Sequence, residues 1–177
     1  MLFSTSPLII QDFHADAQHV GGHRRGYRWI VLHSTGGTDS KLWLSRTSPL
    51  DNPVSVHRLV TKRGENIKIA NDEEVAWTQG PARIGPLPQK TPQGATIESV
   101  NDWALSIEFE NLNDGRDPYP SPQLEMGAAQ IVEWWGVHGF IAPVAHSWIQ
   151  SNKTDPAGFP WDLFYSMIWG RLRAIAR

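Results

Sequence analysis

The chain has 177 residues, of which 40% are hydrophobic and 19% are charged, a balance that suits one globular domain with a substantial core. Its net charge of −2, with histidines counted as neutral, provides no overall basic field, so nucleic acid is not an expected partner. Because the chain has no cysteine, disulfides are excluded and any metal must be held by histidine, carboxylate or water ligands.

The N-terminal region is predicted to be an arm and not a targeting signal. The opening residues MLFSTSPLII lack the basic segment and long apolar core of a signal peptide. No stretch approaches the 18 or so apolar residues of a transmembrane helix, so membrane insertion is not expected. We expect one domain over residues 1–177, synthesised in the cytoplasm, with an arm at 1–27 that includes a short strand and a core at 28–176.

Strand and turn patterns dominate the first half of the core. The apolar run YRWIVL predicts a buried strand at 27–32, and a short helix is expected at about 40–46. Alternation in VSVHRLVT predicts a strand at 54–61. The turn KRGE then predicts that residues 66–70 return beside it as the second strand of a hairpin.

The second half adds one more strand and two long helices. Residues 80–101 are rich in proline and glycine and are expected to form a long loop beside a substrate cleft. The sequence WALSIEFE predicts a strand at 103–110. Apolar residues at helical spacing predict helices at 123–137 and 161–176.

Three polar side chains near these elements are candidate metal ligands. His33 directly follows the first buried strand, His146 lies in a short segment after Pro143, and Asp155 comes nine positions later. Two imidazoles and one carboxylate leave a tetrahedral position open for water, as in catalytic zinc sites. Spacing alone leaves the alternatives open, because a histidine at a strand end usually has a local hydrogen-bond partner and Asp-Pro is a common turn.

Four motifs, in chain order, resemble the type 2 N-acetylmuramoyl-L-alanine amidases, which share a fold with the peptidoglycan recognition proteins and the phage lysozyme-type amidases. WIVLHSTGG resembles the opening strand and its histidine, and SVHRLVTKRGENIKIANDEEVAWTQG resembles the family's hairpin. LSIEFEN resembles the strand with the acidic residue, and AHSWIQSNKTDPAGFPWDLF resembles the closing segment. Together the motifs span residues 29–164.

The resemblance implies an α/β fold: a single domain with a central mixed β-sheet of five or six strands flanked by α-helices. It also implies one zinc ion bound by His33, His146 and Asp155. Glu108 aligns with the family's acidic catalytic residue, and Lys153 aligns with the lysine beside the metal. From pattern alone, these two would be an exposed strand residue and a solvated loop lysine.

The implied reaction is hydrolysis of the amide bond between N-acetylmuramic acid and L-alanine in peptidoglycan. Zinc lowers the pKa of a bound water towards about 7 and polarises the scissile carbonyl. Glu108 would take the proton of the water and pass it to the leaving amine, and Lys153 would stabilise the oxyanion.

Three residues are expected to contact the substrate. His57 is expected to line the groove, with a simple packed histidine as the alternative. Trp77 is predicted to form a groove wall, since indole faces stack on sugar rings. Thr78 follows it, where many relatives have a histidine. Val56 stands where some relatives have a tyrosine, which leaves the acid–base role to Glu108.

Two other functions stay open at this point: a non-catalytic peptidoglycan-binding module of the same fold, and a zinc hydrolase that acts on another amide. The full set of ligand and catalytic residues favours the amidase. We expect a monomer that acts on peptidoglycan or muropeptides. A phage-type endolysin released to the cell wall by lysis fits best, with a cytoplasmic recycling enzyme as the other setting.

Overall fold

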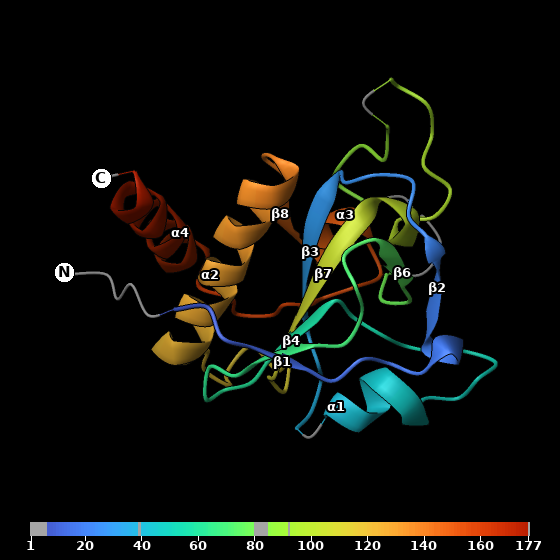
Figure 1. Cartoon of the computed structure of the whole chain (residues 1–177), viewed down its shortest axis with the longest axis horizontal. Coiled ribbons are helices and arrows are strands. Elements are labelled where there is room, and N and C mark those ends of the chain that lie inside the picture. Colours follow the sequence, from blue (N-terminus) through green and yellow to red (C-terminus); the bar gives the residue numbers. More distant parts are fainter. Residues whose placement is uncertain (1–6, 39, 80–84, 92, 177) are drawn as a thin grey trace.

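The computed structural model describes residues 7–38, 40–79, 85–91 and 93–176, which form an α/β fold around a six-stranded mixed sheet (Figure 1). The strand order is β1-β5-β4-β7-β3-β8. Within the sheet, β3 pairs in parallel with β7 and β8, whereas β4 and β5 form an antiparallel hairpin. The strands are β1 (Ile10–Asp12), β3 (Trp29–Ser34), β4 (Arg58–Val60), β5 (Asn66–Lys68), β7 (Ala104–Phe109) and β8 (Ala142–Ala145).

Two long helices, α2 and α4, cover one face of this sheet (Figure 1). The short helices and a small second sheet, in which β2 pairs with β6, lie on the other side. The remaining elements are η1 (Ala17–His19), β2 (Val20–His23), α1 (Ser40–Leu42), the π-helical turn η2 (Trp43–Thr47), β6 (Glu74–Ala76), η3 (Asn101–Trp103), α2 (Ser121–His138), α3 (His146–Ile149) and α4 (Trp161–Ile175). No helix in these described ranges is long and apolar enough to cross a membrane.

Alternation along the central strands divides the core into two layers. Ile30 and Leu32 of β3 pack with α2 and α4, while Trp29 and Val31 pack on the opposite face with Ile149 of α3. Because successive side chains point to opposite faces, His33 lies on the face away from α2 and α4. The same reasoning places Glu108 of β7 on that face.

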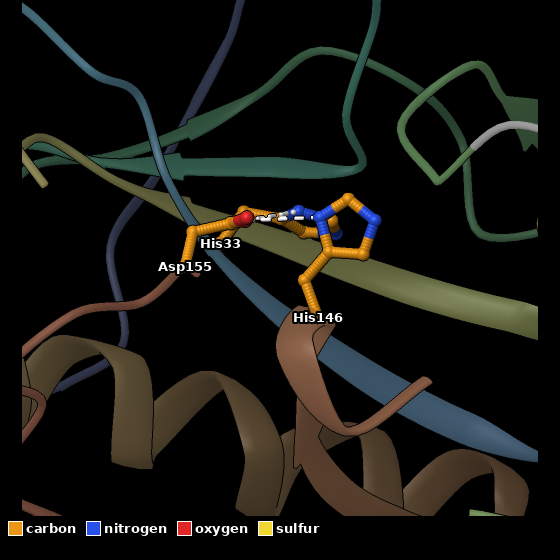
Figure 2. A group of neighbouring side chains, drawn as sticks. All are labelled: His33, His146 and Asp155. Atoms are coloured by element: carbon orange, nitrogen blue, oxygen red, sulfur yellow. Dashed lines mark hydrogen bonds and ion pairs between the residues drawn. The ribbon is translucent and has the colours of Figure 1, made fainter. Parts of the chain in front are cut away.

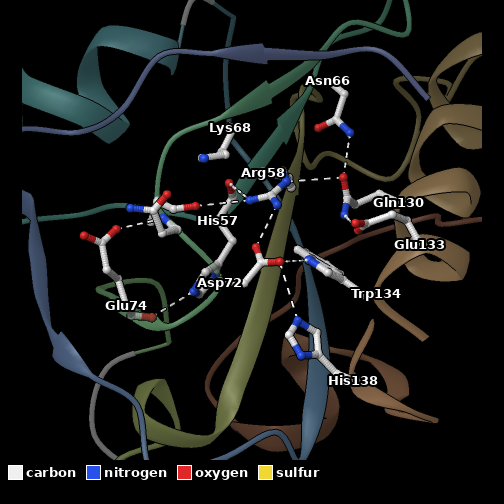
Figure 3. A network of polar contacts seen from close by, with 12 residues as sticks. His57, Arg58, Asn66, Lys68, Asp72, Glu74, Gln130, Glu133, Trp134 and His138 are labelled. Carbon is white, nitrogen blue, oxygen red and sulfur yellow. Dashed lines mark hydrogen bonds and ion pairs between the residues drawn. The ribbon is translucent and has the colours of Figure 1, made fainter. Parts of the chain in front are cut away.

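A buried polar network ties α2 to the sheet (Figure 3). Arg58 of β4 is 4% exposed and donates to Asp72 at 2.7 Å and to Gln130 of α2 at 3.2 Å. The indole nitrogen of Trp134, also on α2, donates to the other oxygen of Asp72 at 2.9 Å. These partners satisfy a charge that would otherwise be costly to bury.

Gly127 of α2 is required by packing, because a Cβ there would lie 2.6 Å from Cζ of Phe109. Phe109 is fully buried among Phe159 and Phe164 and cannot move aside. We expect Gly127→Ala to lower the free energy of unfolding by about 1–2 kcal/mol, because overpacking outweighs the helix propensity of alanine. At Gly136 of the same helix, a Cβ would meet no described atom outside the helix backbone within 4 Å.

Gly136→Ala is therefore the matched control and is expected to raise the free energy of unfolding by up to about 1 kcal/mol. Urea unfolding of both variants measures the difference. Equal effects at the two positions would contradict the packing argument.

Most predicted elements agree with the structure, and the main differences are as follows. The described part of the arm, residues 7–27, belongs to the fold, since β1 pairs in parallel with β5 and β2 pairs with β6. The strand expected at 54–61 is reduced to β4. The segment after Pro143 had no assigned element, yet it forms β8 and then α3. Of the loop at 80–101, residues 80–84 and 92 lie outside the described part, and the rest packs through Ile97 and Val100 against the core.

Candidate metal centre

Three predicted ligands converge at one end of the central sheet (Figure 2). His33 lies near the end of β3, His146 is the first residue of α3, and Asp155 lies in the loop that follows α3. The Nδ1 atoms of both histidines lie 3.0 Å from the same oxygen, Oδ2 of Asp155. The three side chains come from segments as far as 122 positions apart, yet their ligand atoms all lie within 4.8 Å of one another.

Strand register explains this convergence. In the parallel pairing of β3 with β8, Leu32 is opposite Ala145, so the next residues, His33 of β3 and His146 at the start of α3, lie side by side. The chain then turns through α3, and the Ser147 amide donates to the Asp155 carbonyl at 3.0 Å, which returns Asp155 to the same point.

The protonation states suit cation binding. Burial and the neighbouring His146 lower the pKa of His33 to about 4, so its imidazole is neutral at pH 7. Burial acts to raise the pKa of Asp155, but its contacts with the His146 and His33 rings hold that pKa well below its usual range. Two nitrogen ligands and one carboxylate are a donor set that zinc takes, and both nitrogen–oxygen distances of 3.0 Å are close to the roughly 3.3 Å that separates tetrahedral ligands about 2.0–2.1 Å from the ion.

The contacts of His146 provide a second test of whether these residues fit a zinc ion. Its Nδ1 faces Asp155, and its Nε2 lies 3.0 Å from the side-chain oxygen Oε1 of Gln150. Both neighbours are acceptors, whereas a neutral imidazole has only one N–H donor. A doubly protonated ring or a cation bound at Nδ1 resolves this conflict, and the second solution uses the donor set that zinc prefers.

Glu108 lies directly beside this cluster, because it is opposite His33 in the parallel ladder between β3 and β7. The side chain is buried, and its Oε2 has no hydrogen-bond partner within the described residues. Burial raises the pKa of Glu108 well above its usual range; the nearby Asp155 adds to this effect and Lys153 opposes it. A buried carboxyl with a free oxygen and a raised pKa can accept and return a proton.

A cleft of about 570 Å³ opens beside the cluster. The predicted residues Trp77, Thr78 and Lys153 all line it. The Thr78 hydroxyl donates to the Ser55 carbonyl at 2.6 Å, which fixes that wall. The other lining residues are Asp51, Asn52, Pro53, Val54, Gln79, Asn101, Gln150 and Asn152.

His57 does not line the cleft, contrary to the expected groove position. It is fully buried, with Nδ1 2.8 Å from the Ser106 hydroxyl and Nε2 2.5 Å from a guanidinium nitrogen of Arg24. Burial and the neighbouring Arg24 lower the pKa of His57 well below its usual value. With no exposed atom, His57 has the role of a packed histidine between β4, β7 and the arm.

Two residues at the cluster were not among those selected from the sequence. Gln79 and Gln150 contact the ring nitrogens of His33 and His146 that face away from Asp155. Gln150 could have been found from the sequence, because it lies four residues after His146, and this spacing puts two side chains on the same side of a helix. Gln79 had no comparable signal, because it is brought to His33 by tertiary contacts alone.

Comparisons with known proteins identify similar folds and a family. A search of curated proteins finds no match. Among solved structures, a selenomethionine derivative of AmpD has a TM-score of 0.74 at 21% identity, covering 95% of this chain and 99% of AmpD. The amidase AmiD from E. coli, solved with anhydro-N-acetylmuramic acid-L-Ala-D-gamma-Glu-L-Lys, has a TM-score of 0.63 at 22% identity, covering 80% of this chain and 57% of AmiD.

A third similar structure is the endolysin LysCS, an N-acetylmuramoyl-L-alanine amidase from Clostridium intestinale URNW. Its TM-score is 0.61 at 15% identity, with 89% of this chain and 93% of LysCS covered. These likenesses establish the shared fold. The sequence profile of the Amidase_2 family, described as N-acetylmuramoyl-L-alanine amidase, matches residues 23–158, which is more than half of the chain. The chain therefore belongs to the N-acetylmuramoyl-L-alanine amidase family.

Proposed function

We propose that this protein is a zinc-dependent hydrolase of the amide bond between N-acetylmuramic acid and L-alanine. The observation that carries the proposal is the meeting of His33, His146 and Asp155 beside Glu108, a buried carboxyl with an oxygen that has no partner in the described structure. A binding module needs neither an open ligand set nor a carboxyl prepared for proton transfer.

The residues divide the chemistry between holding the metal and moving a proton. His33, His146 and Asp155 would hold zinc, which supplies a lowered pKa for water and a polarised carbonyl. Glu108 takes a proton from the attacking water and delivers it to the alanine nitrogen as the C–N bond breaks. Lys153, at the cleft wall, stabilises the negative charge on the carbonyl oxygen. The products are a lactyl carboxylate and a free amine.

The cleft fits a substrate with both sugar and peptide parts. Trp77 offers a partly exposed aromatic surface for a sugar ring, and polar side chains surround it. AmiD, which has the same fold, was solved with a muropeptide of this class. We infer that peptidoglycan or its muropeptide fragments are the substrate.

The test is metal analysis combined with amine release. Purified protein should contain about one zinc per chain and should release new L-alanine amines from a muropeptide. Removal of the metal with a chelator should abolish release, and one equivalent of zinc should restore it. Zinc at 1,000 times its dissociation constant should also stabilise the fold by about 4 kcal/mol, measured as a rise in Tm. Stoichiometric zinc without amine release would favour the binding module.

The endolysin setting is a further part of the proposal, supported by the likeness to the endolysin LysCS. An assay distinguishes an endolysin from a recycling enzyme if it compares intact cell-wall sacculi with isolated muropeptides at equal concentration of the scissile amide bond. An endolysin should release amines from sacculi. Cleavage of fragments alone would assign the protein to muropeptide recycling instead.

A further inference from the structure

Two buried glutamines hold the ring nitrogens of the candidate ligands that face away from Asp155. The side-chain nitrogen of Gln79 lies 3.2 Å from Nε2 of His33, and Oε1 of Gln150 lies 3.0 Å from Nε2 of His146. Gln79 is 3% exposed and Gln150 is 2% exposed. Each imidazole therefore lies between a carboxylate on its Nδ1 side and a glutamine on its Nε2 side.

The orientation of Gln150 is determined by a second contact. Its amide nitrogen donates to the backbone carbonyl of Gln79 at 2.6 Å, so its oxygen faces His146. That oxygen can only accept, and it therefore selects the ring form with a proton on Nε2. In the neutral ring the lone pair of Nδ1 then points towards Asp155, which is the arrangement that a cation between them requires.

Gln79 can make the same contact with His33 after a half-turn of its amide. At present its nitrogen faces the ring, while its Oε1 is buried without a hydrogen-bond partner among the described residues. A half-turn exchanges the oxygen and the nitrogen. The oxygen would then accept from Nε2–H of His33, and Nδ1 would be free of its proton.

We propose that Gln79 and Gln150 are positioning residues that hold His33 and His146 in the Nε2–H form and so present both Nδ1 lone pairs to the metal. This inference rests on the proposed function, because it takes these histidines to be zinc ligands. Hydrogen-bond partners of metal-bound histidines fix the ring orientation and raise ligand basicity, and their loss typically weakens metal binding about 10- to 100-fold.

Zinc affinity tests the proposal without relying on turnover. In competition with a chromophoric chelator, Gln79→Met and Gln150→Met should each raise the zinc Kd about 10- to 100-fold. Gln150→Glu, which keeps an acceptor opposite His146, should stay closer to the wild type than Gln150→Met. Gln130→Met is the matched control, since Gln130 is fully buried but bonds to Arg58, Asn66 and Glu133. Its zinc Kd should be unchanged.

The tautomers can be read in the wild-type protein, so the test does not depend on the variants folding. Long-range ¹H–¹⁵N spectra of the histidine-labelled, zinc-loaded protein should show His33 and His146 protonated at Nε2 and bound to metal through Nδ1. Metal bound through Nε2 would overturn the proposal.

The outcomes separate this inference from the proposed function. Wild-type protein that takes up no zinc contradicts the metal site itself. Wild-type protein that binds zinc, together with glutamine variants of unchanged Kd, overturns only the positioning role.

Discussion

Glu108→Gln is expected to lower kcat for amine release about 10³-fold while the zinc content stays at one per chain. The amide keeps the size of the side chain but cannot take a proton from water, and general acid–base catalysis contributes about 10²- to 10⁴-fold. Burial is the first cause that raises the pKa of Glu108, so this carboxyl holds a proton more readily than an exposed carboxyl does. Steady-state kinetics on a muropeptide, with metal analysis of the same samples, measures both quantities.

Glu110→Gln provides the matched control for this substitution. Glu110 lies two residues further along the chain, its carboxylate accepts a hydrogen bond from the Lys62 amide at 3.0 Å, and it is not one of the three candidate ligands. We expect its kcat to stay within a few-fold of the wild-type value. Wild-type turnover by Glu108→Gln would refute the assigned proton transfer. Loss of zinc from that variant would instead show that Glu108 supports the metal.

Asp155→Ala is expected to abolish stoichiometric zinc binding and amine release together. The substitution removes the only carboxylate of the proposed ligand set. Two neutral imidazoles would then bind the zinc ion with no negative ligand to balance its charge. The zinc Kd should rise by more than the roughly 10- to 100-fold that loss of a ligand's hydrogen-bond partner costs. Chelator competition measures the Kd, and thermal unfolding with and without zinc shows whether the metal still stabilises the fold.

Asp162→Ala tests whether loss of any nearby carboxylate has the same effect. Asp162 is exposed at the start of α4 and does not line the cleft. It should keep zinc, activity and the zinc-dependent rise in Tm. If Asp155→Ala retained full zinc and activity, the proposed ligand set would be wrong.

Much of the fold could be predicted because it depends on local periodicity. Residues 29–32, directly before His33, are all apolar and form most of the buried strand β3, and apolar residues at helical spacing form α2 and α4. The KRGE turn correctly predicted the antiparallel pairing of β4 with β5. The short strands β1, β2 and β6 were less visible, because three or four residues are too few for a periodic pattern and their pairing partners are distant in the chain.

The candidate site divides in the same way between sequence and tertiary structure. Residue types within recognisable motifs were enough to select His33, His146, Asp155 and Glu108. The same reasoning expected His57 to line the groove. The alternating pattern of its segment could not indicate that Arg24, from the arm, contacts the His57 ring.

What the sequence determined by itself was the chemical inventory: two imidazoles and a carboxylate that can bind a cation, with an acid and a lysine for proton transfer and charge stabilisation. Only the tertiary structure decided how these groups meet. The register of β3 against β7 and β8 places Glu108 and His146 beside His33, and long-range packing brings Gln79 to the far side of the same ring. The physical reason is that side-chain chemistry is a property of single residues, whereas distance, burial and hydrogen-bond partners depend on contacts between segments far apart in the chain.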